Sequence, residues 1–525
     1  MLNKLPDSIV HHILFFLPTK DHSRLSCVSR RCRDLCISTP YVALSNMNYN
    51  ITEISRRFRF NNFVDRFMSR RNWHGAKLHT FILHWCFELP LTDEAYRVDT
   101  WLSHAVNSGV QKIQLELSGT ERIPLPQFIL SCKSMSFLSV KTNNSVLKLP
   151  STLSAGRGIN TTLQILVLDY LQIEDDFFGE WLSQFKSLKK LNLTRISRIK
   201  RISLVGCGID TSLQTLVLDS VQIEEEYYFG EWLSHFKSLK LLNLTRIRGI
   251  KSMSIHNSSI DVLAIKHCDD LVDISIFAEK LRKLHILWHP HNKSSSVGSL
   301  KILAPNLGDF RWVGHVVDYY CVEDFSSKLH PIIALRLSDQ LYESSTKYYL
   351  HKILCSMQRA QVLTLRDEFV EVLFKYGCLP YSFDNLEYLA ILRTSSFEDK
   401  IPAVSSLLRE TISLKWLFLL NDTKVPSKKL SFKLEYWESQ NLMFINQLKG
   451  IVVELSNRGS DVELMKYLLK NTKVLERAFI ICSQTVPTNL IFELRKYKAP
   501  PTELVCYHES SKFVRQIRNL YTFDI

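Results

Sequence analysis

Apolar residues recur in the pattern LxxLxL along most of the chain. The clearest copies lie in a duplicated segment: LQILVLDYLQIEDDFFGEWLSQFKSLKKLNLTRI begins at Leu163, and a close copy with one inserted residue begins 50 residues later, at Leu213. Each copy contains the pattern twice, so the underlying period is about 25 residues. One unit of this length cannot bury its own apolar face, which predicts a stack of similar units that share a core.

Weaker copies continue the pattern in both directions. They begin at Val110, Met135, Ile260, Leu281, Leu307, Ile332, Ala360, Leu386 and Leu414, and all neighbouring copies are separated by 21 to 28 residues. In each copy the leucines should point into the core from a short strand, and the residues between them should face the open concave side. The period is that of leucine-rich repeats. We therefore expect an α/β solenoid over residues 101–425, with a curved parallel sheet and with helices and loops on its convex side. Two further matches, at Ile199 and Ile250, fall between the repeats and predict a second short strand in some of them.

The segments that return between strands show helical spacing. Phe178, Trp181, Leu182 and Phe185 follow the spacing of one helix face, and Phe229, Trp232, Leu233 and Phe236 repeat it. The acidic triplets 174–176 and 224–226 precede these helices. Negative charge at the start of a helix is favourable, so we interpret the triplets as capping residues and not as catalytic carboxylates.

Three short helices are predicted between Leu5 and Thr39. Ile9, Ile13, Leu14 and Leu17 form an apolar stripe between Pro6 and Pro18, and Ser29 can cap a third helix that contains Cys32, Leu35 and Cys36. Because a segment this short buries little apolar surface by itself, we expect it to pack against a partner.

The string LPDSIVHHILFFLPTKDHSRLSCVSRRCRDLC resembles an F-box, the motif that binds the Skp adaptor of cullin-based ubiquitin ligases. The resemblance implies an F-box over residues 1–40, with adaptor contacts from Leu5, Pro6, Ile9, Ile13, Leu14, Leu17, Pro18, Leu25 and Val28. The chain departs from the family at Cys32 and Cys36, where aromatic residues are usual, and at His22 and Ser23, where apolar residues are common. Loss of aromatic anchors at an interface costs about 1–3 kcal/mol, so we expect weakened adaptor binding.

Two later segments extend the resemblance. Val98–Leu117 is similar to the segment that opens the repeats of plant F-box/leucine-rich-repeat proteins, and Gln447–Ile480 is similar to the FBD domain that ends many of them. The resemblance implies a connector over residues 41–100 and an FBD-like region over residues 426–525. The residues themselves predict two more strands, from Leu448 and Leu475, and a helix with Met465, Leu468 and Leu469 between them. This region is either a terminal cap on the stack or an interaction module.

Composition agrees with a globular protein. The chain has 525 residues, 46% of them hydrophobic and 22% charged, and a net charge of +14. Twelve dispersed cysteines form no disulfide framework, Asp7, His11 and His12 interrupt any signal-peptide core, and no apolar run could span a bilayer. We expect no membrane association and a cytoplasmic or nuclear location.

Arginines alternate with aromatic residues over 56–71, a pattern that can indicate a nucleic-acid-binding surface. We interpret this stretch instead as an amphipathic connector with Phe63, Val64 and Phe67 facing inward, so nucleic-acid binding is the less favoured reading.

No pattern indicates catalysis. Cys27, Cys32 and Cys36 lack a second ligand pair at zinc spacing, and Pro290 separates His289 from His291 and prevents a regular metal-binding helix. The glycine-rich phosphate and dinucleotide motifs and the nucleophile elbow are absent from the sequence, as is a RING-like cysteine array. We expect no metal, no cofactor and no catalytic centre.

The resemblance implies a substrate-recognition subunit of a Skp–cullin–F-box ubiquitin ligase, which would bind the adaptor, through it the cullin, and a target protein through the repeats. A ligase-independent interaction scaffold with a degenerate F-box is the alternative. Predicted concave positions that would contact the target are Lys190, Asn192, Asn243, Lys283, His285 and Arg311, with Thr194, Thr245 and Asp309 beside them. This polar and basic middle lies between apolar positions at Ile165, Val167, Trp416 and Phe418, and suits an acidic or phosphorylated segment. Those apolar positions could equally be covered by neighbouring loops.

Overall fold

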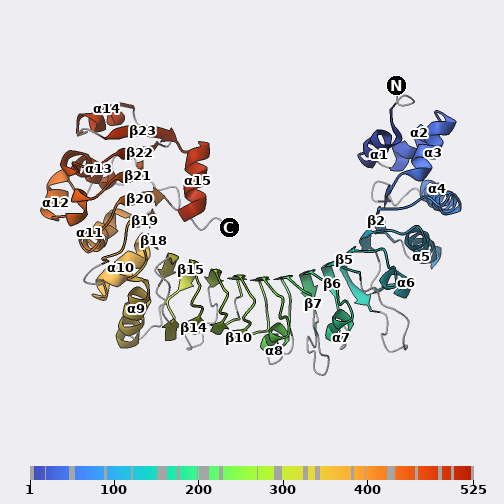
Figure 1. The fold of residues 1–525 in the computed structure, drawn as a ribbon, viewed down its shortest axis with the longest axis horizontal. Helices are drawn as coiled ribbons and strands as arrows, with labels where there is room; N and C mark the ends of the chain where they lie inside the picture. The colour runs from blue at the N-terminus through green and yellow to red at the C-terminus, as the bar shows by residue number, and fades with distance from the viewer. Residues whose placement is uncertain are drawn as a thin grey trace. The chain divides into compact units, whose positions relative to one another are not determined.

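The computed structural model describes residues 5–17, 19–46, 54–87, 92–119, 122–149, 162–173, 178–197, 199, 212–223, 229–268, 270–288, 298–317, 319–322, 329–336, 343–379, 383–394, 397–421, 432–455, 459–482, 488–497 and 502–521. The chain forms two compact units, residues 1–250 and 251–525, and Figure 1 shows their elements.

The N-terminal unit begins with the three predicted helices, α1 (Asp7–Phe15), α2 (Thr19–Ser26) and α3 (Arg30–Ser38). Ser29 caps α3 as expected, since its hydroxyl oxygen accepts a hydrogen bond from the Cys32 amide at 3.0 Å. A small core holds the helices together. It consists of Val10, Leu14, Leu35 and Cys36, with Leu5, Leu17 and Leu25 packed against it.

A ladder of parallel strands follows. It runs in chain order through β1 (Tyr41–Ser45), β2 (Thr80–Cys86), β3 (Lys112–Ser118), β5 (Phe137–Lys148), β6 (Ile165–Gln172), β7 (Lys190–Ser197), β8 (Thr215–Asp219) and β9 (Leu241–Thr245). The short β4 (Arg122–Pro124) pairs with β5. The connecting helices are α4 (Ile54–Trp73), α5 (Thr92–Asn107), α6 (Gln127–Leu130), α7 (Phe178–Ser183) and α8 (Phe229–Ser234). All eight residues of the two predicted helix faces are buried, but Phe185 and Phe236 lie just beyond the ends of α7 and α8.

The predicted connector is itself part of the ladder. Strands β1 and β2 pair in parallel and β2 pairs with β3, so the repeats begin at Tyr41 and not near residue 101. Val64 and Phe67 of α4 are buried, as predicted, and Phe63 is half-buried. The first repeats escaped the LxxLxL search because their strands are rich in aromatic and β-branched residues, as in TFILHWC of β2.

Each duplicated repeat turns through a left-handed residue after its strand core. Tyr170, Arg195, Ser220 and Arg246 have φ values of 55°, 52°, 55° and 51°. The two arginines clamp the neighbouring repeat: Arg195 binds Asp169 with both carboxylate oxygens engaged, at 2.6–2.9 Å, and Arg246 binds Asp219 at 2.6 and 2.7 Å. Such forked pairs fix geometry, which helps to hold these strained turns in register. The acidic triplets lie outside the described residues.

The C-terminal unit continues the same architecture. Its main ladder runs through β11 (Val262–Lys266), β13 (Lys283–Trp288), β15 (Asp309–His315), β17 (His330–Arg336), β18 (Val362–Arg366), β19 (Tyr388–Arg393), β20 (Trp416–Asn421), β21 (Gly450–Leu455), β22 (Arg477–Cys482) and β23 (Glu503–His508). Its helices are α9 (Glu343–Met357), α10 (Asp367–Lys375), α11 (Ile401–Arg409), α12 (Leu434–Ser439), α13 (Ser460–Asn471), α14 (Thr488–Lys496) and α15 (Lys512–Tyr521), with short 3₁₀ turns η3 (Phe397–Lys400) and η4 (Met443–Asn446). The FBD-like region thus extends the ladder with three strands, and Met465, Leu468 and Leu469 are buried on α13 as predicted.

The leucine pattern gave the correct register over most of this ladder. Leu363 of β18 lies opposite Leu389, which lies opposite Leu417, and the series continues through Ile451 and Ala478. The second short strand predicted from Ile250 is also present: β10 (Ser252–His256) pairs with β12 (Asp273–Phe277), followed by β14 (Ser299–Leu303) and β16 (Tyr319–Val322). In the repeat at Ile199 only Ile199 itself is described, and it forms a bridge with Ile223.

The predicted register at β17 is wrong by four residues. The copy that begins at Ile332 would align Leu337 with Trp312 of β15 and Leu365 of β18, but Ile333 lies opposite both. Residues 332–335 are all buried, so the middle of the strand carries no polar residue that would mark its outer face.

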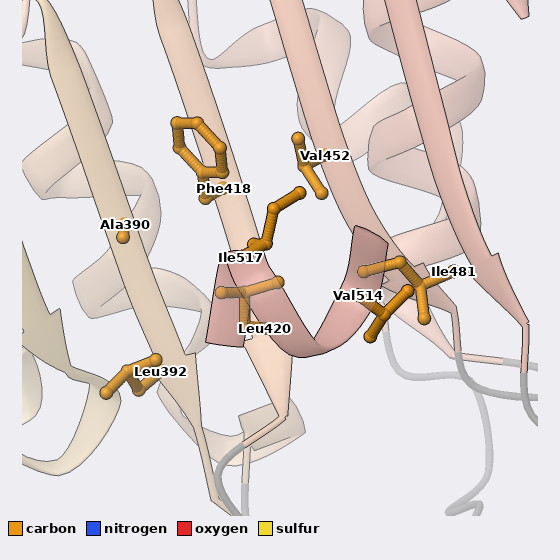
Figure 2. Close-up of a cluster of buried hydrophobic side chains, with 8 residues drawn as sticks. All are labelled: Ala390, Leu392, Phe418, Leu420, Val452, Ile481, Val514 and Ile517. Carbon is orange, nitrogen blue, oxygen red and sulfur yellow. The ribbon is translucent and has the colours of Figure 1, made fainter. Parts of the chain in front are cut away.

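Helix α15 crosses the predicted concave face of the C-terminal strands. Val514 and Ile517 pack into a cluster with Phe418, Val452 and Ile481, and Figure 2 shows the helix lying over the strands that carry these side chains. Ala390, Leu392 and Leu420 complete the cluster, and Trp416 packs at its edge. The apolar end of the concave face predicted at Trp416 and Phe418 is therefore covered by the chain's own last helix.

Candidate docking helices and target-facing strands

Helix α1 has two apolar faces. Val10 and Leu14 point into the small core and are 4% and 2% exposed, whereas Ile9 and Ile13 point outward and are 47% and 38% exposed. One turn beyond Ile13, Phe16 is 68% exposed. Residues at this spacing share one helix face. We call Ile9, Ile13 and Phe16 the α1 outer strip. It is a row of apolar side chains that the described part of the chain leaves in contact with solvent.

The other predicted adaptor-binding residues divide in the same way. Pro6 and Val28 are exposed, with Val28 at 72%. Leu5, Leu17 and Leu25 pack on the core and are half-buried. The structure therefore places Leu14 inside the helical module, where it stabilises the fold and offers no surface. Pro18 lies outside the described residues.

Arg31 ties the start of the chain to α3. Its Nη2 donates to the Leu5 carbonyl at 2.6 Å and to the Asp7 carboxylate at 2.9 Å. The pair is largely solvent-exposed, so its net energy is small, but it orients the residues that lead into α1.

Cys32 and Cys36 face the interior. Their side chains are 8% and 2% exposed, and burial, followed by the proximity of Cys32, raises the pKa of the Cys36 thiol to about 11. The exchange of aromatic residues for cysteines therefore changes the packing of the helical module. We expected these two cysteines to remove aromatic anchors from an adaptor surface, but both positions are buried inside the module and do not form such a surface.

In the N-terminal unit the predicted target-facing residues lie together on the sheet. Asn192 and Asn243 are in line on either side of Val217, and Lys190 is exposed at the start of β7. Each asparagine accepts a hydrogen bond from the threonine two residues later: Thr194 donates to Asn192 and Thr245 to Asn243, both at 3.0 Å. The carbonyl oxygen of each amide is thus engaged, and its NH₂ group is the part suited to meet an acceptor on a partner.

In the C-terminal unit a charged group forms on four neighbouring strands, and we call it the Asp309 cluster: Lys266, Lys283, His285, Asp309, Arg311 and His330. The Asp309 carboxylate lies 3.4 Å from His285 Nε2 and 3.3 Å from Arg311 Nε. Burial raises the pKa of Asp309, but the hydrogen bond to His285 and the charge of Arg311 outweigh it and lower the pKa overall. Burial and Arg311 lower the pKa of Lys266.

The Asp309 cluster thus contains two lysines and one arginine but one carboxylate. Such an excess of positive charge favours an anionic partner. Phe16, Lys266 and His330 were missed from the sequence, although Phe16 stands one helical turn after Ile13 and Lys266 occupies a concave position of its repeat.

Features of other site types are limited. Among the described residues no group of three or more His, Cys, Asp and Glu side chains is arranged to hold a metal ion. Within the same residues no helix is long and apolar enough to cross a membrane. His289 and His291 lie outside the described residues.

Comparison with known proteins agrees with the fold. The F-box domain family model matches residues 2–41. The chain is 26% identical over 205 residues to Arabidopsis thaliana F-box/LRR-repeat protein At3g59190. The matched segment covers 37% of this chain and only 50% of that protein. It is 22% identical over 521 residues to Arabidopsis thaliana F-box/FBD/LRR-repeat protein At4g03220. This match covers 93% of this chain and 91% of the relative. A third relative, F-box/FBD/LRR-repeat protein At1g66290 of the same species, is 23% identical over 91% of this chain and 86% of its own length. The resemblance is therefore confirmed: the chain carries an N-terminal F-box domain and is similar over nearly its whole length to plant F-box proteins with leucine-rich repeats and an FBD region.

Proposed function

We propose that this protein is a substrate-recognition subunit of a Skp–cullin–F-box ubiquitin ligase. The F-box match at residues 2–41 supports the role. The observation that carries it is the α1 outer strip, because exposed apolar side chains at helical spacing on so small a module are typical of a surface that a partner covers. The partner would be a Skp-type adaptor, and through it a cullin.

Catalysis in such an assembly would need no reactive group on this chain. The subunit would hold a target protein near a ubiquitin-charged enzyme that the cullin recruits. Holding the target lysine beside the thioester replaces a bimolecular encounter by an effectively intramolecular one, which accelerates transfer. The free thiols of the described cysteines suit the cytosol or nucleus, where we place the protein.

We further propose that the strand faces bind the target. The Asp309 cluster supports an acidic or phosphorylated segment, because Arg311 and two lysines are available to pair with carboxylate or phosphate oxygens. In the N-terminal unit, Lys190 and the two asparagines offer further donors. Replacing Lys190, Lys283 and Arg311 together with glutamate should abolish capture of the target and leave adaptor binding intact.

Adaptor binding can be tested directly by titrating the full chain with purified Skp-type adaptors. Replacing Ile9 and Ile13 with aspartate should weaken binding at least tenfold, because charges would enter an apolar contact. Phe374→Asp is the matched control: Phe374 is 45% exposed, similar to Ile9, but lies on α10 of the other unit. Equal loss in the control would show that the effect is not specific to the F-box.

The alternative is a ligase-independent interaction scaffold with a degenerate F-box. Failure of the wild-type chain to bind any adaptor paralogue would favour that role. Binding that is unaffected by Ile9→Asp and Ile13→Asp would instead move the adaptor contact to another surface of the chain.

A further inference from the structure

A cleft separates the F-box helices from the first long helix of the repeats. It has a volume of about 400 Å³ and lies between α2 and α3 on one side and α4 on the other. Phe63 and Phe67 of α4 contribute aromatic rings, which stack on each other with centroids 5.9 Å apart. A volume of this size is within the range of sites for small organic molecules.

The cleft coincides with the departures of this chain from the F-box pattern. His22, Ser23 and Cys36 are three of its lining residues. The resemblance leads one to expect apolar residues in place of His22 and Ser23 and an aromatic residue in place of Cys36. The small side chains of Ser23 and Cys36 leave space that bulkier residues would fill. The hollow is thus encoded by particular residues of this sequence.

One lining residue of the cleft, His22, is a buried histidine. The residue is 4% exposed, and its Nε2 lies 2.8 Å from the Leu14 carbonyl oxygen. A carbonyl oxygen only accepts, so Nε2 must carry the proton, and in the neutral ring Nδ1 is then an acceptor. Burial lowers the pKa of His22, which keeps the ring neutral at pH 7. Within the described part of the chain Nδ1 has no hydrogen-bond partner.

The cleft is also strongly basic. Arg24, Arg33, Arg66 and Arg70 line it, and none of its lining residues that the structure describes is an aspartate or glutamate. Arg24 is paired with Asp21 at 3.0 Å, whereas the side chains of Arg66 and Arg70 form no hydrogen bond or ion pair with any described residue. Behind them the guanidinium of Arg71 is buried. It donates to the Ile37 carbonyl through Nη1, and its Nη2 has no partner among the described residues.

We propose that this cleft binds a small amphipathic organic anion. Its apolar ring system would lie against Phe63 and Phe67, its acidic group would meet Arg66 and Arg70, and an N–H or O–H of the ligand would donate to Nδ1 of His22. The field of four lining arginines and the buried Arg71 excludes a cation, and the aromatic wall disfavours a small inorganic anion alone. The proposal does not depend on adaptor binding and holds equally for a scaffold.

The full chain can be tested with two dyes that share one ring system. 8-Anilinonaphthalene-1-sulfonate has the apolar rings, an N–H donor and an anionic group, and N-phenyl-1-naphthylamine lacks only the sulfonate. We expect one high-affinity site for the anionic dye, bound at least tenfold more tightly than the neutral one. In the variant with Arg66→Gln and Arg70→Gln this preference should disappear. A variant with Arg30→Gln and Arg59→Gln loses the same charge from α3 and α4 at positions outside the cleft and should retain the preference.

Two further variants separate the cleft from other dye sites. His22→Leu removes the acceptor and should weaken both dyes several-fold, since both carry the N–H. Cys36→Phe should fill the hollow and abolish binding, and a melting temperature at or above that of the wild type would show that the helices remain folded. Equal affinity for the two dyes in the wild-type chain would overturn the proposal, and so would unchanged binding in the Arg66/Arg70 variant. Should Cys36→Phe unfold the helices, the two arginine variants still decide the outcome.

Discussion

Arg518 of α15 donates to Glu454 of β21, with Nη2 and Oε1 2.7 Å apart. The other carboxylate oxygen of Glu454 accepts from the backbone amide of Asn421 on β20 at 3.1 Å. One carboxylate therefore connects the last helix to two strands of the sheet. The same helix contributes Val514 and Ile517 to the apolar cluster with Phe418, Val452 and Ile481 (Figure 2). This contact helps to hold α15 against the face of the C-terminal strands.

Ile517→Asp should detach α15 from the strands. The change removes an apolar side chain that is 8% exposed and places a charge against apolar neighbours, at a cost of about 2–5 kcal/mol. Hydrogen exchange should increase over residues 512–521 and over β20 and β21. Gln516→Asp, on the exposed side of the same helix, should leave exchange unchanged. Equal protection in both variants would mean that α15 is not held by this cluster.

Glu94→Ala should destabilise the N-terminal unit. The Glu94 carboxylate accepts from Arg57 Nε and Nη2 at 2.6 Å each, and from Asn61 and Trp85 at 3.1 and 3.3 Å. Burial raises the pKa of Glu94, but these hydrogen bonds lower it overall. Removing the carboxylate takes the ion-pair partner Glu94 from the buried guanidinium of Arg57, which costs about 3–5 kcal/mol. The melting temperature should fall by several degrees, whereas Asp21→Ala, which breaks the exposed pair with Arg24, should not change it measurably.

His22 should make the helical module sensitive to acid. Its pKa is lowered in the folded state because of burial, below the ordinary value of 6.5. The unfolded chain therefore binds the proton more readily than the folded chain, so the stability contribution is fully present above pH 6.5 and is lost as the pH falls below that value. The protection factors of the α1–α3 amides, which are corrected for the intrinsic pH dependence of exchange, should fall between pH 7.5 and pH 5.5, and His22→Gln should remove this fall. The same fall in His22→Gln would assign the effect to another group.

Leu14→Ala and Ile13→Ala should have opposite consequences. Leu14 is 2% exposed within the small core, so its truncation should cost about 2–5 kcal/mol and loosen all three helices. Ile13 is 38% exposed, so its truncation should leave the fold unaltered and weaken adaptor binding. Circular dichroism and the adaptor titration, measured on the same two variants, check both statements. A destabilised Ile13→Ala would show that the outer strip is part of the core.

Gly249→Ala should disturb the repeat that contains it. Gly249 has φ +84°, and a Cβ atom there would lie 2.0 Å from the Ile223 carbonyl oxygen. Gly75 is the matched control, because its φ is +60° but a Cβ atom would meet nothing within 4 Å. Both substitutions carry the left-handed penalty of about 1–2 kcal/mol. Only Gly249→Ala should also move backbone, which a larger fall in melting temperature would reveal.

The strands could be predicted because the leucine spacing is set by the local geometry of one repeat. The α1 helix was harder: Ile9, Val10, Ile13 and Leu14 are all apolar, so the sequence does not distinguish the face that meets Leu35 from the face that meets solvent. The placement of α15 depends on contacts with residues about 100 positions earlier, such as Phe418, and no local period encodes them. The cleft is lined by His22, Ser23 and Cys36 on one side and by residues of α4 on the other. It could not be predicted from the sequence, because it depends on how α4 packs against α2 and α3.

The paired turns at Tyr170 and Arg195, and at Ser220 and Arg246, imply that the ladder can change length in whole steps. Strand β6 meets β7 with Ile165 opposite Lys190, and β8 meets β9 in the equivalent register, with Thr215 opposite Leu241. Deletion of residues 190–240 would therefore bring β6 and β9 together as a matched pair, with Asp169 facing Arg246 as it now faces Arg195. A gene encoding such a chain can gain or lose a copy by unequal recombination and still specify a continuous sheet, so the width of the strand face can evolve without any redesign of the fold.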